Sequence, residues 1–225
     1  MAKRDHKFEN DWVWVKKQSL ATAAREAGFD LAMFEQYSED TQKELRKKSV
    51  KYVLRNISDA FEEEAKYELS EVSYGVYVIR LSAPFSVQYR NSECEDGGET
   101  TSQIIYIGRG NVSGRLKGHF ERKLFDFMQS LSGAEFDIQI LDPNSDHFSK
   151  NNLHKQIEHD LLEAFAERIT CKNKGYPLLN KNSGDPAGLD YCGEKWDGPL
   201  RKRDKRKIEW MITPTDSWRS LNLDR

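Results

Sequence analysis

An arginine and a histidine stand four residues apart on a helix that the sequence predicts directly after a short strand. Residues 104–107 are β-prone and end at Gly108, and Arg115 and His119 follow a few residues later. Side chains four residues apart share one face of a helix, one turn above the other. A strand, a glycine turn and a helix that presents these two side chains at the rim of a core form an active-site layout.

Periodic apolar residues predict the elements that position this pair. Asn111 or Ser113 can cap a helix that runs to Leu131. Residues 74–81 and 134–141 read as further strands, because β-prone or alternating apolar residues fill them. A second strongly periodic helix covers residues 151–169, and its apolar stripe is Leu153, Ile157, Leu161, Phe165 and Ile169.

Two short strands that each carry a tyrosine beside a glycine resemble the GIY-YIG nuclease family. The first motif reads Gly75-Val76-Tyr77 and the second reads Tyr106-Ile107-Gly108. The resemblance continues in order along the chain, to the family's arginine, helix histidine or tyrosine, metal-binding glutamate and terminal asparagine. The matching positions are Arg115, His119, Glu158 and Asn180.

The resemblance implies an α+β fold with a small three-stranded antiparallel sheet flanked by helices, over residues 73–184. Residues 1–72 read as a helical region, with one helix from about residue 40 to 56 and another from about 58 to 69. Within that region, the residue pattern of 20–30 is similar to that of a helix-turn-helix, although plain helical packing is the favoured interpretation. Residues 185–225 read as an irregular, basic extension that contains tryptophan.

The activity implied by the resemblance is that of a metal-dependent DNA endonuclease. Glu158 would hold one Mg²⁺ or Mn²⁺ ion, in a one-metal mechanism that hydrolyses phosphodiester bonds. Arg115 would bind the scissile phosphate. Tyr77, Tyr106 and His119 are all candidates for the general base, and we favour Tyr77 with His119 assisting through a hydrogen bond. Asn180 would orient the site.

Contacts with DNA, expected to be double-stranded, must come from local patches of charge. The chain has 35 lysine and arginine residues against 37 acidic ones, a formal charge of −2, so its overall balance does not indicate nucleic-acid binding. Arg109 follows the second motif and is a candidate phosphate contact. The densest basic cluster, which could attract a phosphate backbone, consists of Arg201, Lys202, Arg203, Lys205, Arg206 and Lys207.

Composition narrows the class of protein. A length of 225 residues allows one large domain or a small domain with additions, and the 37% of residues that are hydrophobic are enough for a core. The three cysteines are far apart and form no CxxC pair, which favours a reducing cytoplasm over a disulfide framework. No apolar run is long enough to predict a membrane span, and the first residues lack the apolar stretch of a signal peptide.

Three other interpretations compete with a nuclease. His154, Glu158 and His159 suggest a zinc site, but the usual pair of histidines four apart with a glutamate between them is absent. A second alternative is a non-catalytic nucleic-acid-binding protein on the same scaffold. A third is a homo-oligomeric assembly factor built through residues 1–72. For a nuclease whose single module is joined to flanks that the family does not share, restriction or phage defence is a candidate role.

Overall fold

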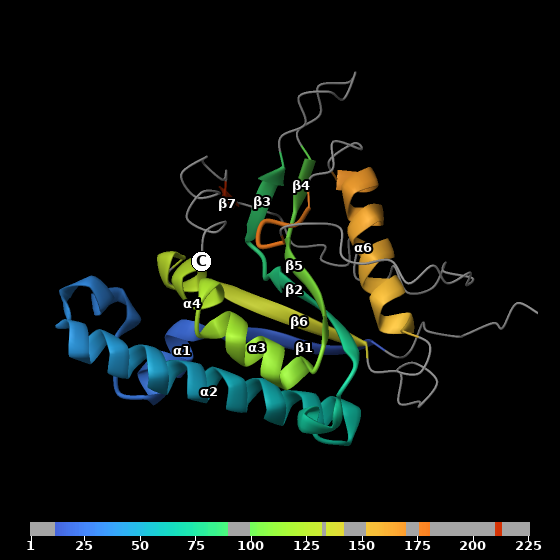
Figure 1. The fold of residues 1–225 in the computed structure, drawn as a ribbon. Coiled ribbons are helices and arrows are strands. Elements are labelled where there is room, and N and C mark those ends of the chain that lie inside the picture. The colour runs from blue at the N-terminus through green and yellow to red at the C-terminus, as the bar shows by residue number, and fades with distance from the viewer. Residues whose placement is uncertain are drawn as a thin grey trace, which may run out of the picture.

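A computed structural model describes residues 12–89, 100–131, 134–141, 152–169, 176–180 and 210–212. Helices and strands are mixed along the chain and pack around a central antiparallel sheet (Figure 1). The fold is therefore α+β, as the sequence predicted. The basic cluster from Arg201 to Lys207, predicted to contact substrate, lies outside the described residues.

Four strands form the central sheet, in the order β1-β6-β2-β5, and all neighbours are antiparallel. The bounds are β1 Trp12–Ser19, β2 Gly75–Leu81, β5 Ile104–Gly110 and β6 Glu135–Leu141. The prediction of three strands is corrected to four, because β1 pairs with β6 and covers what would otherwise be an open edge. Trp and Val fill the start of β1, inside the region predicted to be helical, and these residues favour strands.

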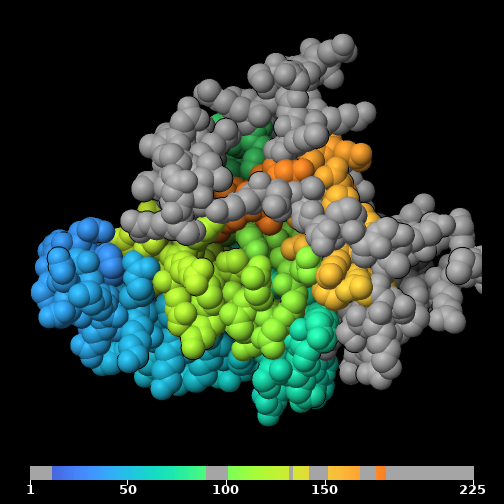
Figure 2. Space-filling view, viewed as in Figure 1, coloured from blue at the N-terminus to red at the C-terminus, as the bar shows by residue number. Residues whose placement is uncertain are grey.

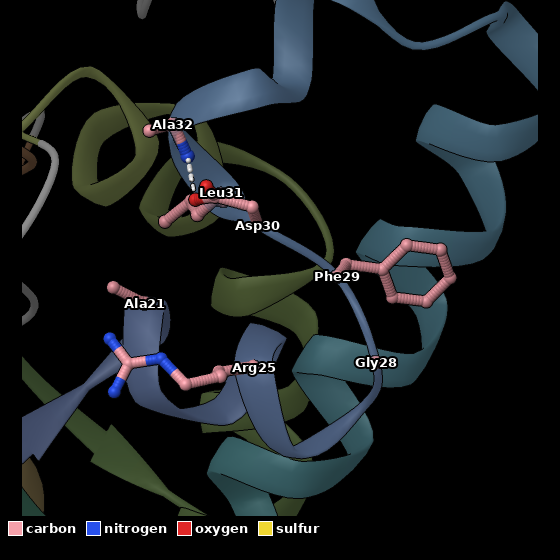
Figure 3. A pocket seen from close by; sticks show the side chains of 7 residues that line it. All are labelled: Ala21, Arg25, Gly28, Phe29, Asp30, Leu31 and Ala32. Carbon is pink, nitrogen blue, oxygen red and sulfur yellow. Dashed lines mark hydrogen bonds between the residues drawn. The ribbon is translucent and has the colours of Figure 1, made fainter.

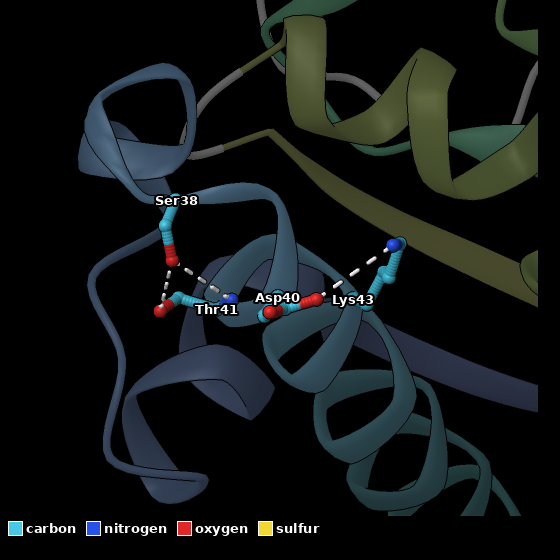
Figure 4. A network of polar contacts seen from close by, with 4 residues as sticks. All are labelled: Ser38, Asp40, Thr41 and Lys43. Atoms are coloured by element: carbon cyan, nitrogen blue, oxygen red, sulfur yellow. Dashed lines mark hydrogen bonds and ion pairs between the residues drawn. The ribbon is translucent and has the colours of Figure 1, made fainter.

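Most of the described residues between β1 and β2 are helical. It contains α1 Leu20–Glu26, the 3-10 helix η1 Leu31–Gln36 and α2 Glu39–Ala65. The two predicted helices in this stretch are one continuous helix of 27 residues. Its N-terminal cap is Ser38, whose hydroxyl accepts a hydrogen bond from the Thr41 N–H at 3.3 Å. Asp40 and Lys43, three residues apart at the start of the helix, form an ion pair at 3.7 Å (Figure 4).

Residues 20–30, whose pattern is similar to that of a helix-turn-helix, do not contain two α-helices. After α1, Gly28 adopts a φ of +86° and the chain turns into η1, six residues in 3-10 conformation. Figure 3 shows the open hollow between them, with Arg25 on one side and Asp30 accepting a hydrogen bond from the Ala32 N–H on the other. Plain helical packing, the favoured interpretation, agrees with this geometry.

The predicted helix from residue 111 to 131 is divided in two. It consists of α3 Val112–Phe120 and α4 Lys123–Ser130, and Arg122 between them leaves helical geometry. In one continuous helix, Phe125 would point about 180° away from Leu116 at 100° per residue. Both side chains are fully buried, so the break allows Phe125 to reach the core together with Leu116.

Helices pack on different sides of the sheet. In Figure 1, α2, α3 and α4 lie together along its lower side, while α6 Leu153–Ile169 stands apart from them, against β5 and β2. A smaller sheet has the order β4-β3-β7, from Phe85–Tyr89 (β3), Thr100–Ser102 (β4) and Trp210–Ile212 (β7). The short 3-10 helix η2 Leu69–Glu71 leads into β2. None of the described helices combines the length and apolar composition of a membrane span.

Candidate active site

The pairing of β2 with β5 brings the two motif tyrosines together. Tyr77 lies opposite Gly108 and Ile79 lies opposite Tyr106. Because side chains alternate between the faces of a strand, this register puts Tyr77 and Tyr106 diagonally on one face of the sheet. Their ring centroids are 5.8 Å apart, and Tyr77 is completely buried.

Gly108 leaves the space that the two tyrosine rings occupy. A Cβ atom at this position would lie 2.5 Å from Cε1 of Tyr106 and 2.8 Å from the Tyr77 hydroxyl oxygen, distances that real Cβ atoms do not show. Gly75 is similarly enclosed, with Cγ2 of Val112 at 2.7 Å from such an atom. The glycines of the two motifs are therefore required by close packing, one against the tyrosines and one against α3.

Helix α3 places the imidazole of His119 beside the phenol groups of Tyr77 and Tyr106. Asn111 caps this helix by accepting a hydrogen bond from the Gly114 N–H at 2.7 Å, which confirms the first of the two predicted caps. His119 lies near the end of α3, and its Nε2 is 2.9 Å from the Tyr77 hydroxyl oxygen. Its ring centroid is 4.3 Å from that of Tyr106. Two phenols and one imidazole thus share one pocket.

Arg115 completes this group from one turn earlier on α3. Its guanidinium acts on both phenols, by charge and by hydrogen bonding, and it lowers their pKa against the effect of burial. Arg115 is nevertheless exposed to solvent overall. The side chain therefore interacts with the buried phenols, although the residue as a whole remains accessible to solvent.

Burial controls the protonation of the pocket. Burial raises the pKa of Tyr77 well above its usual value and Tyr106 adds to this increase, so Tyr77 is neutral near pH 7. Burial, with help from Arg115, Lys123 and Arg122, lowers the pKa of His119 to about 4. A neutral imidazole therefore faces a neutral phenol across a hydrogen bond, and Nε2 can accept the phenol proton. The lowering of both tyrosine pKa values by Arg115 is outweighed by the effect of burial in the free protein.

Glu158 lies on α6 and is paired with Arg109 from β5. The Arg109 Nε donates to Oε2 of Glu158 at 2.7 Å, and the two side chains are 26% and 11% exposed. Burial raises the pKa of this carboxyl and Arg109 opposes that increase. Charge also links Glu158 to Tyr106 and Arg115. The carboxylate therefore belongs to the same electrostatic group as the phenols.

Asn180 holds the backbone of β5. Its Oδ1 accepts from the Ile107 N–H at 2.9 Å and its Nδ2 donates to the Ile107 carbonyl at 2.7 Å. Leu179 adds a backbone bond to Ile105. Ile107 is the middle residue of the second motif, so Asn180 fixes the strand that carries Tyr106.

A divalent ion fits the chemistry of this site through a single carboxylate. Glu158 offers hard oxygen donors, which Mg²⁺ and Mn²⁺ prefer, and waters and phosphate oxygens would supply the other ligands. Among the described residues, no three His, Cys, Asp or Glu side chains are grouped to hold a metal, so the zinc alternative gains no support there. His154 is instead buried, with its ring 5.4 Å from that of Tyr74.

Positive charge is concentrated around the phenol pocket. Residues 109–123 carry five arginine and lysine residues and a single acidic residue, Glu121, although the whole chain has a formal charge of −2. Arg122 and Lys123 are close enough to His119 to influence its pKa. Figure 2 shows α3 at the surface, between α2 and α6, so much of this stretch is accessible from one face.

The structure thus brings together Tyr77, Tyr106, Arg115 and His119, and links Glu158 and Asn180 to them through Arg109, charge and the β5 backbone. Sequence reasoning missed Tyr89, whose hydroxyl donates to the Ile104 carbonyl at 2.8 Å and accepts from the Leu178 N–H at 3.0 Å. It also missed the pairing of Arg109 with Glu158. The positions of these two residues on different elements carried no signal that they would meet.

No protein-family model matches the sequence, and neither a curated protein nor a solved structure is significantly similar to it.

Proposed function

We propose that the protein is a metal-dependent DNA endonuclease of the GIY-YIG type, built on the strands β2, β5 and β6. The observation that supports this most strongly is the packing of Tyr77, Tyr106 and His119 into one pocket, with Gly108 leaving room for the rings. Ordinary core tyrosines need neither a partly buried imidazole partner nor an arginine beside the same rings. The concentration of positive charge along residues 109–123 suits a phosphate backbone.

Arg115 is the residue that binds the scissile phosphate in this proposal. Its planar fork matches two phosphate oxygens, and it stabilises the negative charge that grows on them during hydrolysis. Glu158 holds the divalent ion. When bound, that ion neutralises phosphate charge and assists the departure of the leaving oxygen.

Tyr77 and His119 move the proton of the attacking water. Tyr77 accepts this proton on its hydroxyl oxygen as it passes its own proton to Nε2 of His119, across the 2.9 Å hydrogen bond. The relay avoids a free phenolate, which the buried position of Tyr77 makes costly. His119 begins neutral, because its pKa is about 4, so its nitrogen is open to the proton.

A non-catalytic DNA-binding protein is the second candidate. One observation favours it, because Arg109 already neutralises the only carboxylate that we assign to metal binding. A site whose carboxylate stayed paired in this way would bind phosphate without cutting it.

Cleavage of supercoiled plasmid and phage DNA with Mg²⁺ or Mn²⁺ tests the two candidates. We expect the wild type to cut only with metal, and Arg115→Ala and Glu158→Ala to lose cutting by at least about 10²-fold. Lys51→Ala on α2 and Glu167→Ala on α6 are the matched controls, since both positions are exposed and neither belongs to the cationic stretch at residues 109–123. Binding without cutting by the wild type, on every substrate, would leave the second candidate. The fragment pattern separates a restriction-like activity from general degradation.

A further inference from the structure

The pairing of Arg109 with Glu158 has a consequence for how ligands bind. Arg109 is the next-to-last residue of β5 and Glu158 lies one-third of the way along α6, so the pair joins the sheet to a separate helix. The distance of 2.7 Å between Nε and Oε2 is that of a charge-assisted hydrogen bond. The pair is therefore a definite interaction of the free protein.

The two partners differ in their access to solvent. Glu158 is 11% exposed, whereas Arg109 keeps 26% of its side chain exposed. An enclosed carboxylate is costly to leave without a positive partner, because it is largely removed from water. Arg109 lies at the more open side of the pair and is followed by Gly110, which has a φ of +109°. The arginine is thus the partner that can leave.

A divalent ion and a guanidinium compete for the same carboxylate. If both stayed, two cations would crowd one carboxylate, and like charges in a partly buried site repel strongly. A phosphate close to β5 offers Arg109 another anionic partner of suitable geometry. The cationic stretch that begins at Arg109 is where the backbone of DNA would lie.

We propose that Arg109 exchanges partners: it neutralises Glu158 in the free protein and moves to a DNA phosphate when a divalent ion takes its place on the carboxylate. This inference rests on the proposed function, since it requires both a metal at Glu158 and a nucleic-acid substrate. Arg109 is then a positioning residue that couples the two ligands. The free protein binds metal weakly, DNA strengthens metal binding, and metal strengthens DNA binding by the same factor.

The test measures Mn²⁺ binding to the full chain by electron paramagnetic resonance, with no reference to cleavage. Without DNA, we expect Arg109→Gln to bind Mn²⁺ about tenfold more tightly than the wild type, a coupling of ordinary size. Lys43→Gln removes one cation from α2 and is the matched control for charge, because the Lys43 side chain is 74% exposed and its Nζ lies 3.7 Å from a carboxylate oxygen of Asp40. It should leave Mn²⁺ affinity nearly unchanged.

Duplex DNA supplies the second half of the test, with titrations in the cold where turnover is slow. DNA should tighten Mn²⁺ binding by the wild type severalfold and by Arg109→Gln much less. Arg109→Lys keeps the charge, so its gain in Mn²⁺ affinity from DNA should lie between those of the wild type and Arg109→Gln. This conservative variant keeps the test valid if Arg109→Gln folds poorly. Melting curves with Mn²⁺ give an independent readout, because a ligand that binds the folded state raises Tm according to its affinity.

Each outcome is informative. Equal or weaker Mn²⁺ binding by folded Arg109→Gln, or the same gain from DNA in all variants, overturns the exchange while metal-dependent cleavage by the wild type stands. If neither the wild type nor any variant binds Mn²⁺ more tightly than Glu158→Gln, the metal site itself is overturned, and the exchange with it.

Discussion

The two halves of the candidate site satisfy their polar groups in different ways. In the half formed by β2, β5 and α3, buried neutral phenols and a partly buried neutral imidazole are hydrogen-bonded, with Tyr77 and His119 2.9 Å apart. In the half formed by β5 and α6, two full charges face each other, Arg109 and Glu158 at 2.7 Å. The first half is assembled by close packing and the second by charge, so substitutions should affect them differently.

The largest effect expected in the packed half is on catalysis. Tyr77→Phe keeps the ring and removes the hydroxyl that faces His119, so we expect the single-turnover cleavage rate to fall by about 10²–10⁴-fold, the usual range for a general base. DNA affinity should change little. Tyr106→Phe is the matched control and should slow cleavage less. The reverse order of the two variants would assign the base to Tyr106.

Packing in the same half can be broken without touching a polar group. Gly108→Ala would put a methyl group 2.5 Å from the Tyr106 ring, and relieving this overlap should destabilise the protein by about 1–3 kcal/mol. Gly118→Ala is the matched control on α3, where no atom lies within 4 Å of an added Cβ, so the helix should gain up to about 1 kcal/mol. Urea unfolding measures both. Equal stability of the two variants would mean that the rings do not require Gly108.

The pH dependence of stability tests the packed half with a smaller expected effect than either substitution. The pKa of His119 is lowered to about 4 in the folded protein, against about 6.5 for a free histidine, so the unfolded chain binds more protons between these values. The contribution of the neutral imidazole to the free energy of unfolding is therefore fully present above pH 6.5, and it is lost as the pH falls towards 4. Allowing for partial exposure, the loss by pH 4.5 should be about 1–2 kcal/mol.

Urea unfolding at pH 7 and pH 4.5 isolates this contribution when the wild type is compared with His119→Asn. The variant should lose less stability on acidification than the wild type. If both proteins lost the same amount, His119 would not be buried in its neutral form, and the relay from Tyr77 would lack its acceptor.

Local patterns predicted much of the scaffold. The strands β2, β5 and β6 and the helix α6 all lie within a few residues of their predicted positions, because alternation and 3.6-residue periodicity are local properties. Errors arose where distant residues decided the outcome. Strand β1 exists because β6, more than 110 residues away, offers an edge to pair with. The division between α3 and α4 follows from the burial of Phe125, which its sequence neighbours do not dictate.

The sequence by itself determined the two tyrosine motifs, the arginine and histidine one turn apart on α3, and the glutamate on the rim of α6, since residue types and helical spacing need no tertiary information. Only the tertiary structure decided how these groups are charged and paired. Burial keeps Tyr77 and His119 neutral, and the approach of α6 to β5 sets Glu158 against Arg109. Solvation and distance control protonation and pairing, and both exist only once the chain has folded.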